Sequence, residues 1–223
     1  MFDLFGHSQT TQAAFEFPAS LTERYRPRTI DNFIGLVKPK TICTKLAARP
    51  FESGWIFLGP SGTGKTTMAM ALAEMIPAEV HHIPSQSCDL ATLERIARTC
   101  QYVPFETKKF HLILVDEADQ MSMAAQQFCL SKLDGTAPLP MTIWIFTCND
   151  TSRFQDRFIS RNKVIEFSSY GIASDAAALL TRIWQDNAPE TATAPNFARI
   201  VKESNNNVRE ALQKLEIELM LAS

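Results

Sequence analysis

The stretch from Gly59 to Thr66 constrains the fold of this 223-residue chain more than any other. Its letters, GPSGTGKT, follow the pattern of a glycine, any four residues, and then glycine, lysine and threonine. An apolar, strand-forming run at 55–58 precedes the stretch, and a helix-forming run at 67–75 follows it. Glycines at a strand-to-helix turn let backbone N–H groups surround an anion, and the helix dipole adds partial positive charge there. Strand, loop and helix together predict a P-loop that binds nucleotide phosphates.

The P-loop pattern also predicts roles for single residues. Lys65 is expected to reach the β- and γ-phosphates, and the Thr66 hydroxyl is expected to ligate Mg²⁺. The alternative is a plain strand-to-helix connector, which the Lys-Thr pair argues against. We therefore predict ATP and Mg²⁺ as ligands. The ATP-binding residues expected from this stretch are Gly59, Pro60, Ser61, Gly62, Thr63, Gly64, Lys65, Thr66 and Thr67.

Composition narrows the class of protein. The content of 45% hydrophobic and 21% charged residues is typical of a globular chain. No apolar run has the length of a membrane span and the N-terminus lacks a signal-peptide layout, so we expect a cytoplasmic protein without a membrane partner. Five scattered cysteines without a Cys-x-x-Cys pair favour reduced thiols over a disulfide framework or a zinc ribbon. A net charge of −2 means that any DNA contact requires a local basic patch.

A second strand that ends in carboxylates is predicted at Phe110–Val115. A continuous apolar run is typical of a strand buried on both faces of a parallel sheet. Asp116 and Glu117 follow at the end where such sheets bind ligands. In this Walker B pattern Asp116 is expected to hold Mg²⁺, mainly through water, and Glu117 to orient and deprotonate the attacking water. The alternative is a buried strand that ends in an acidic loop, and the preceding P-loop argues against it.

Polar residues lie in or directly after two further predicted strands. Met141–Thr147 is expected to be a buried strand, and Asn149 follows where it can hydrogen-bond the attacking water and the γ-phosphate. By itself such an asparagine indicates only a turn. A short strand at Val80–Ile83 would point the adjacent His81 and His82 to opposite faces, which is poor geometry for one metal ion. We therefore expect these histidines to be structural or solvent-facing.

Residues 21–35 introduce a family resemblance. The run LTERYRPRTIDNFIG resembles the opening segment of clamp-loader ATPases of the AAA+ superfamily, of the replication factor C small-subunit or phage clamp-loader type. In that family the segment lies against the adenine and the ribose. The alternative for this segment is a basic linker with a proline turn. The ATP contacts that the resemblance adds are Tyr25, Arg26, Pro27, Ile34 and Gly35.

Arg161 takes the place of the family's arginine finger, which reaches the γ-phosphate bound by a neighbouring subunit. Arginine suits this role because its planar fork stays charged and binds phosphate through two parallel hydrogen bonds. Asn162 stands where the family has cysteine. Arg153 and Arg157 compete for the same role, and the alternative for all three is a solvated surface charge.

Two further stretches resemble the family. Met121–Asp134 resembles the helix that tracks the DNA backbone, but Ser131 and Lys132 replace its two consecutive basic residues, which lowers the expected number of phosphate contacts. Asn206–Leu212 resembles a lid motif in which Arg209 is sensor 2 and contacts the γ-phosphate of the same ATP. The alternative for Arg209 is an ion pair near the start of its own helix.

The expected fold is α/β: a P-loop AAA+ domain with a five-stranded parallel sheet flanked by helices, followed by a small three-helix lid. Its fifth strand is expected at 164–167. The expected helices are at 39–49, 67–75, 89–101 and 121–134 around the sheet, and at 175–186, 194–204 and 207–221 in the lid. The domain boundaries follow as an N-terminal arm at 1–20, the nucleotide-binding domain at 21–168 and the lid at 169–223. Because the resemblance ends near residue 221, we expect no collar domain of the kind that fastens clamp-loader rings.

The resemblance implies an oligomeric DNA-replication ATPase that couples ATP binding and hydrolysis to assembly on DNA and to the handling of a sliding clamp. Its catalytic residues would be Glu117, Lys65, Asn149 and Arg161. The oligomer, of one or several kinds of subunit, would form through the ATP interfaces and bind primer-template or single-stranded DNA. Residues Phe2–Phe5 end in Asp-Leu-Phe, which resembles clamp-docking peptides; the alternative is a terminal apolar anchor.

Two other function classes stay open. One is a helicase loader or replication initiator of the same superfamily. The other is a nucleotide-switch scaffold with negligible turnover.

Overall fold

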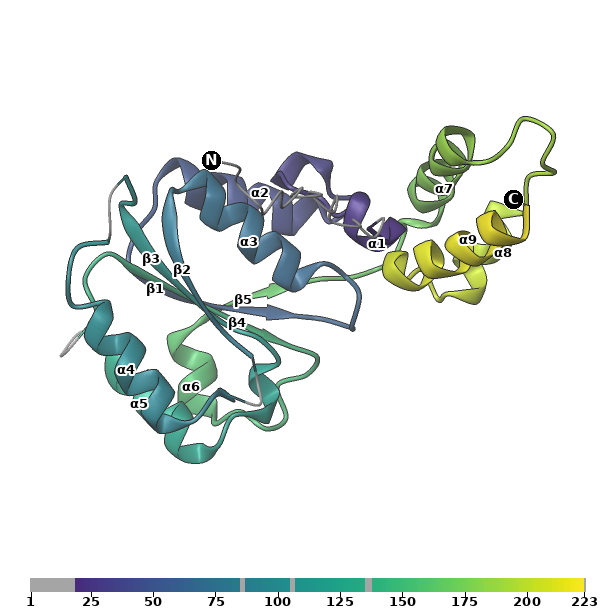
Figure 1. Cartoon of the computed structure of the whole chain (residues 1–223). Helices are drawn as coiled ribbons and strands as arrows, with labels where there is room; N and C mark the ends of the chain where they lie inside the picture. Colours follow the sequence, from purple (N-terminus) through teal and green to yellow (C-terminus); the bar gives the residue numbers. More distant parts are fainter. Residues whose placement is uncertain (1–18, 85–86, 105–106, 135–137, 223) are drawn as a thin grey trace, which may run out of the picture.

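Five apolar segments form one parallel sheet with the strand order β2-β3-β4-β1-β5 (Figure 1). The computed structural model describes residues 19–84, 87–104, 107–134 and 138–222. The five parallel strands with flanking helices confirm the predicted fold class. The strands are β1 (Ser53–Leu58), β2 (Ala78–Ile83), β3 (Phe110–Val115), β4 (Thr142–Cys148) and β5 (Lys163–Glu166).

The sheet topology brings the three functional strand ends together. β1 lies between β4 and β5, with Leu58 opposite Cys148, and β3 pairs with β4 so that Val115 is opposite Phe146. The P-loop, the Walker B carboxylates and Asn149 each follow directly after one of these strands. They therefore meet at the carboxyl edge of the sheet, where the strand order reverses and ligands bind in such folds.

Helices cover both faces of the sheet (Figure 1). One face packs its apolar side chains against α2 and α3, and the opposite face against α4, α5 and α6. β3 and β4 are almost wholly buried between these layers, which explains their continuous apolar sequences. The elements of these layers are η1 (Ile30–Asn32), α2 (Val37–Ala48), α3 (Lys65–Met75), α4 (Leu90–Thr99), η3 (Ala118–Gln120), α5 (Met123–Leu133) and α6 (Asp156–Arg161).

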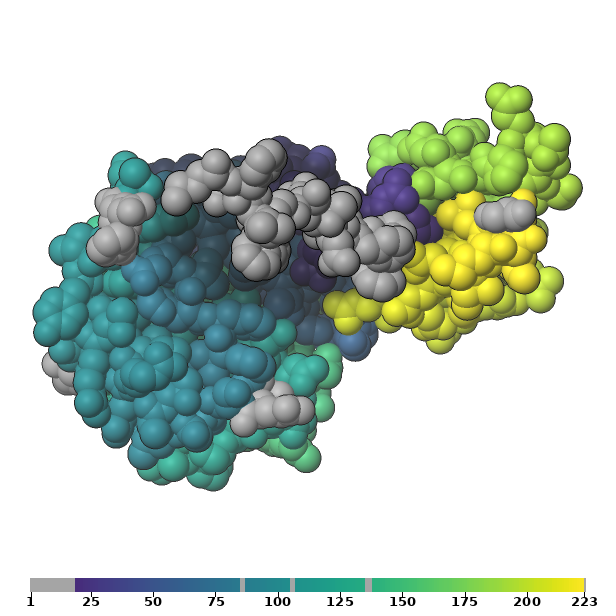
Figure 2. Space-filling view, in the orientation of Figure 1, coloured from purple at the N-terminus to yellow at the C-terminus, as the bar shows by residue number. Residues whose placement is uncertain are grey.

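The C-terminal helices form a lobe beside the sheet layers, drawn green to yellow in Figure 2. This lobe consists of α7 (Ala173–Asn187), α8 (Phe197–Glu203) and α9 (Val208–Ala222), which share one apolar cluster. The first described helix, α1 (Leu21–Arg24), packs into the same cluster through Leu21.

Two polar contacts fasten α1 and its C-cap to the lobe. The backbone N–H of Leu21 donates to Oε1 of Glu216 at 2.9 Å, and Nδ2 of Asn187 donates to the Tyr25 hydroxyl at 3.0 Å. A segment that precedes the sheet in sequence therefore lies on the lobe that follows it. Phe2–Phe5 and most of the expected arm lie outside the described residues. Among the helices described, none combines the length and the apolarity needed to cross a membrane.

Candidate functional site

The P-loop packs closely against two later segments of the chain, and two glycines make this possible. A Cβ at Gly59 would lie 2.1 Å from the carbonyl oxygen of Phe167, and one at Gly62 would lie 2.2 Å from Oδ1 of Asn207. Gly62 also has φ +78°, in the left-handed region that favours glycine. The loop leads directly into the N-terminus of α3, which begins at Lys65. A helix N-terminus favours an anion, and this fits a phosphate ligand.

Lys65 lies at the centre of the loop. Its Nζ donates to the carbonyl oxygens of Gly59 and Pro60 at 2.6 and 2.9 Å, and to Oδ1 of Asn149 at 3.2 Å. Burial lowers the pKa of Lys65, and nearby charges, Asp116 among them, oppose that lowering. Lys65 and Asn149, predicted to act on one phosphate, are thus side by side.

Asp116 is the centre of an oxygen cluster suited to Mg²⁺. Its Oδ1 accepts hydrogen bonds from the Thr66 hydroxyl at 2.7 Å and from the Thr147 hydroxyl at 2.5 Å. Mg²⁺ prefers carboxylate and hydroxyl oxygens, with several sites left for water and phosphate. The predicted metal residues Thr66 and Asp116 are therefore brought together, and the oxygen donors fit the ion.

Glu117 has an unusual backbone conformation. Its φ is +52°, in the left-handed region that is uncommon for residues other than glycine. Its backbone N–H donates to the Thr147 hydroxyl at 3.0 Å. Thr147 thus holds both Walker B residues: the carboxylate of Asp116 and the backbone of Glu117.

Two adjoining cavities run from these residues to the C-terminal lobe. The smaller, about 100 Å³, is lined by Ser61, Gly62, Gly64, Lys65, Thr66, Thr67, Asp116, Glu117, Thr147, Cys148, Asn149 and Arg209. The larger, about 970 Å³, lies between the P-loop, the segment before the sheet, α7 and α9. Gly62, Gly64, Thr67 and Arg209 line both, so the two cavities adjoin. The polar small cavity fits phosphates, and the larger one has room for a nucleoside.

Four of the five residues predicted to contact the nucleoside line the larger cavity: Tyr25, Arg26, Pro27 and Ile34. Gly35 does not line it. A Cβ at Gly35 would lie 2.4 Å from Cγ2 of Ile172, which does line the cavity, so the glycine permits close packing behind the wall. Thr63 lines the larger cavity, whereas Gly59 and Pro60 line neither and instead accept hydrogen bonds from Lys65.

Arg161 lies apart from this site. It is the last residue of α6, its side chain is 52% exposed, and it forms an ion pair with Asp134 at the end of α5. It lines neither cavity, unlike Arg209. The competing Arg153 and Arg157 bond Gln120 and Gln155, also outside the cavities.

Two residues that contact the site are missing from the sequence prediction. Thr147 is a buried polar residue in an apolar strand, and the β3–β4 register places it beside Asp116; this alignment is the signal that identifies it. Asn207 donates from Nδ2 to the carbonyl oxygen of Ser61 at 3.2 Å and thereby joins the lobe to the P-loop. That contact joins residues 146 positions apart in sequence, so no local pattern indicates it.

Replacing Thr147 by valine is expected to raise the Mg²⁺ concentration needed for half-maximal ATP hydrolysis by about 10- to 100-fold. Valine keeps the shape but removes two hydrogen bonds, one of them to a charged group and worth about 1.5–3 kcal/mol. Titration of Mg²⁺ at fixed ATP measures the effect. Thr147→Ser keeps the hydroxyl and should restore the requirement to near the wild-type value; equal requirements in all three proteins would remove Thr147 from the metal site.

The match to a known protein family covers the P-loop and the Walker B residues. The sequence model of the ATPase family associated with various cellular activities (AAA) matches residues 55–170, more than half of the chain. "Replication factor C small subunit 1" of Pyrobaculum islandicum is 32% identical over 153 residues, which are 66% of this chain and 46% of the relative. "Replication factor C small subunit 2" of Pyrobaculum arsenaticum is 27% identical over 202 residues, 87% of this chain and 62% of the relative. The chain thus spans about half to three-fifths of the length of these relatives.

The fold also has neighbours among solved structures. The "Thermotoga maritima RuvB Holliday junction branch migration motor" superposes with a TM-score of 0.67 over 86% of this chain and 64% of that chain. At 19% sequence identity this likeness concerns the fold alone. The predicted P-loop ATPase and its resemblance to replication factor C small subunits are confirmed at the level of the family: this chain belongs to the ATPase family associated with various cellular activities.

Proposed function

We propose that this chain is an ATP-hydrolysing subunit of an oligomeric DNA-replication ATPase that couples ATP binding and hydrolysis to assembly on DNA and to the handling of a sliding clamp. The observation that carries the proposal is the pair of adjoining cavities between the P-loop, the Walker B residues and the C-terminal lobe, with Arg209 lining both. The similarity to proteins named replication factor C small subunits supports the replication role.

The residues around the cavity divide into a nucleoside end and a phosphate end. At the nucleoside end, Tyr25, Arg26, Pro27 and Ile34 would hold the base and ribose. At the phosphate end, the P-loop N–H groups and Lys65 would bind the phosphates, while Thr66 and Asp116 would hold Mg²⁺. Bound there, Mg²⁺ would neutralise phosphate charge and polarise the γ-phosphate.

The remaining polar groups would act on the attacking water. The Glu117 carboxylate takes the proton from water as the water attacks phosphorus, and Asn149, which already bonds Lys65, orients the water and the γ-phosphate. Arg209 approaches the same phosphate from α9. Its contact would depend on the γ-phosphate, so the lobe would respond to the difference between ATP and ADP.

If Arg161 is the arginine finger, it supplies one more cation to an ATP site. Arg161 lies at the surface, held by Asp134, and lines neither cavity of its own subunit. We infer that it acts on the ATP of an adjoining subunit, so the ATP site is also a subunit interface. Hydrolysis would then remove the group that Arg161 and Arg209 both contact, and the interface and the grip on DNA would loosen together.

The test measures ATP hydrolysis by the full chain alone, with primer-template DNA, and with DNA plus the sliding clamp of the same organism. We expect DNA to raise kcat, the clamp to raise it further, and removal of residues 2–5 to lower clamp capture without changing ATP binding. ATP binding with negligible turnover under all conditions would instead favour a scaffold. Stimulation by single-stranded DNA without clamp capture would favour a helicase loader or initiator.

A further inference from the structure

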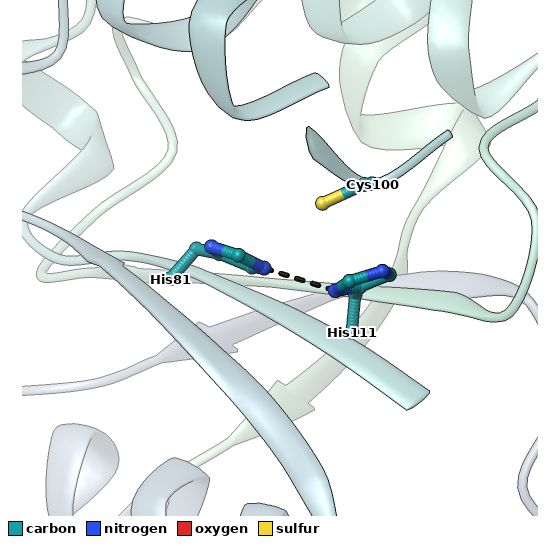
Figure 3. Close-up of side chains that lie close together, drawn as sticks. All are labelled: His81, Cys100 and His111. Atoms are coloured by element: carbon teal, nitrogen blue, oxygen red, sulfur yellow. Dashed lines mark hydrogen bonds between the residues drawn. The ribbon is translucent and has the colours of Figure 1, made fainter. Parts of the chain in front are cut away.

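Three side chains of types that can ligate a metal converge outside the linings of the two nucleotide cavities. Figure 3 shows the rings of His81 and His111 side by side with the thiol of Cys100 pointing toward them. One ligand atom from each of the three residues lies within 4.8 Å of the other two. Cys100 and His111 are buried, and His81 is half-buried. A cluster of two imidazoles and a thiol is a set of donors that transition metals prefer.

The fold assembles this cluster from three elements. Glu79 of β2 is opposite His111 of β3, so Glu79, His81 and His111 share one face of the sheet, since alternate strand residues point the same way. α4 covers this face, and Cys100 directly follows its last residue. β2, β3 and the end of α4 therefore supply His81, His111 and Cys100 respectively.

The hydrogen bonds fix which ring nitrogens carry protons. Nε2 of His111 lies 2.9 Å from the carbonyl oxygen of Tyr102, which can only accept, so Nε2 is the protonated nitrogen. Nδ1 of His111 therefore carries a lone pair, and Nε2 of His81 donates to it at 3.0 Å. A histidine that donates its far N–H to a backbone carbonyl and offers its near lone pair is arranged as metal-ligating histidines are.

We propose that His81, Cys100 and His111 form a binding site for a zinc-class divalent transition-metal ion, through Nε2, Sγ and Nδ1 respectively. Tetrahedral zinc places two nitrogen ligands about 3.3 Å apart and a nitrogen and a sulfur about 3.6 Å apart. The observed separations of 3.0 Å between the nitrogens and at most 4.8 Å among all three atoms require only small side-chain shifts.

The fourth ligand is Glu79 or a water. Oε2 of Glu79 lies 3.6 Å from Nδ1 of His111, and the Glu79 side chain is 33% exposed, so water also reaches this side of the cluster. A carboxylate with two imidazoles and a thiolate satisfies the coordination that zinc prefers. The set is too soft for Mg²⁺ or Ca²⁺, which prefer oxygen ligands.

Burial favours the ligating form of His81 and the protonated form of Cys100, so a metal would have to displace the thiol proton. Burial lowers the pKa of His81, assisted by His111 and Arg95 and opposed by Glu79, so the neutral, ligating ring is favoured. Burial raises the pKa of the Cys100 thiol to about 12. A bound metal deprotonates a coordinating thiol, so uptake would release the thiol proton to solvent, while the His81 proton moves from Nε2 to Nδ1.

This site is separate from the proposed Mg²⁺ site. His111 is the second residue of β3, whereas Asp116 follows the opposite end of that strand. His82 points to the other face of β2, where its Nε2 lies 3.7 Å from Oδ2 of Asp116. A metal at His81, Cys100 and His111 would tie the end of α4 to the edge strand β2 and would be structural.

The experiment measures zinc uptake by the full chain after chelator treatment, with saturating Mg²⁺ present to occupy Thr66 and Asp116. We expect one zinc per chain by equilibrium dialysis and elemental analysis. Cys100→Ser and His81→Gln should each weaken zinc binding at least about 100-fold, since even loss of an outer-shell partner costs about 10- to 100-fold. At free zinc about 100 times its Kd, the folding equilibrium constant of the wild-type chain should rise about 100-fold, as measured by urea unfolding.

Matched variants provide the controls. Cys43→Ser removes another buried thiol, and His82→Gln removes the neighbouring imidazole on the opposite face; both should bind zinc like the wild type. Cobalt substitution in the unmodified chain should give tetrahedral d–d bands and a sulfur-to-cobalt charge-transfer band, a test independent of whether any variant folds. No stoichiometric zinc, a cobalt spectrum without the sulfur band, or equal uptake by wild type and Cys100→Ser would overturn the proposal and leave a hydrogen-bonded histidine pair.

Discussion

Replacing Arg161 by alanine is expected to lower the kcat of the assembled ATPase by about 10³- to 10⁵-fold, the range over which arginine fingers act. ATP affinity of the single chain should change little, because Arg161 lines neither nucleotide cavity and bonds Asp134 at the surface. The physical reason is that the guanidinium stabilises charge that develops on the γ-phosphoryl oxygens only in the transition state. Steady-state ATPase activity over a range of protein concentrations measures the effect.

The matched control is Arg157→Ala, four residues earlier on the same helix, where the guanidinium bonds Gln155. Its turnover should stay close to the wild-type value. Because Arg161 is proposed to act on a neighbour, mixing Arg161→Ala with Glu117→Gln chains should restore part of the activity where copies of this chain adjoin. The second protein then supplies the arginine, and the first supplies an intact Walker B site. Equal turnover of wild type and Arg161→Ala would exclude the residue from this role.

Replacing Glu117 by glutamine is expected to slow ATP hydrolysis about 10²- to 10⁴-fold while ATP·Mg²⁺ binding is retained. Glutamine keeps the size and the hydrogen-bonding capacity of the side chain but cannot take a proton from water. The Thr147 hydroxyl bonds the Glu117 backbone and the Asp116 carboxylate, both of which the substitution leaves in place. ATP-bound assemblies should therefore accumulate, as seen by single-turnover kinetics together with mass measurement.

Glu166→Gln serves as its control, since Glu166 ends strand β5, which pairs with β1, and lines neither cavity. Hydrolysis by this control should match the wild type. If Glu117→Gln instead weakened ATP binding as strongly as it slowed hydrolysis, Glu117 would be a binding group and not the base.

Local sequence signals predicted the elements that carry the site. Apolar runs and the P-loop glycines indicate the strands β1, β3 and β4, and Asp89, the first residue of the helix predicted at 89–101, caps α4 by accepting from the Thr92 N–H at 2.7 Å. The predicted helix starts differ from the structure where a polar side chain caps the helix. α5 begins at Met123 because the Ser122 hydroxyl accepts from Ala125, and α8 begins after the capping residue Asn196.

Local sequence patterns do not indicate contacts between segments that are distant in the chain. The prediction placed His81 and His82 on opposite faces, and they are; it had no means of placing Cys100 and His111 beside His81. The docking of α1 on the C-terminal lobe likewise depends on Leu21 and Glu216, which no periodicity connects. The domain boundary at residue 21 stays a prediction. That boundary assigns Leu21 to the nucleotide-binding domain, whereas the Leu21 side chain packs in the apolar cluster of the C-terminal lobe.

The docking of α1 means that the chain crosses twice between the sheet layers and the lobe. One crossing follows Tyr25, and the other follows Phe167; both line the larger cavity, through Arg26 and Ser168 among others. Arg26 and Ser168, at the two crossings, and Arg209, on the lobe, all line the larger cavity. A nucleotide bound there would therefore contact both connections and the lobe at once, so occupancy of the cavity and the position of the lobe would be linked.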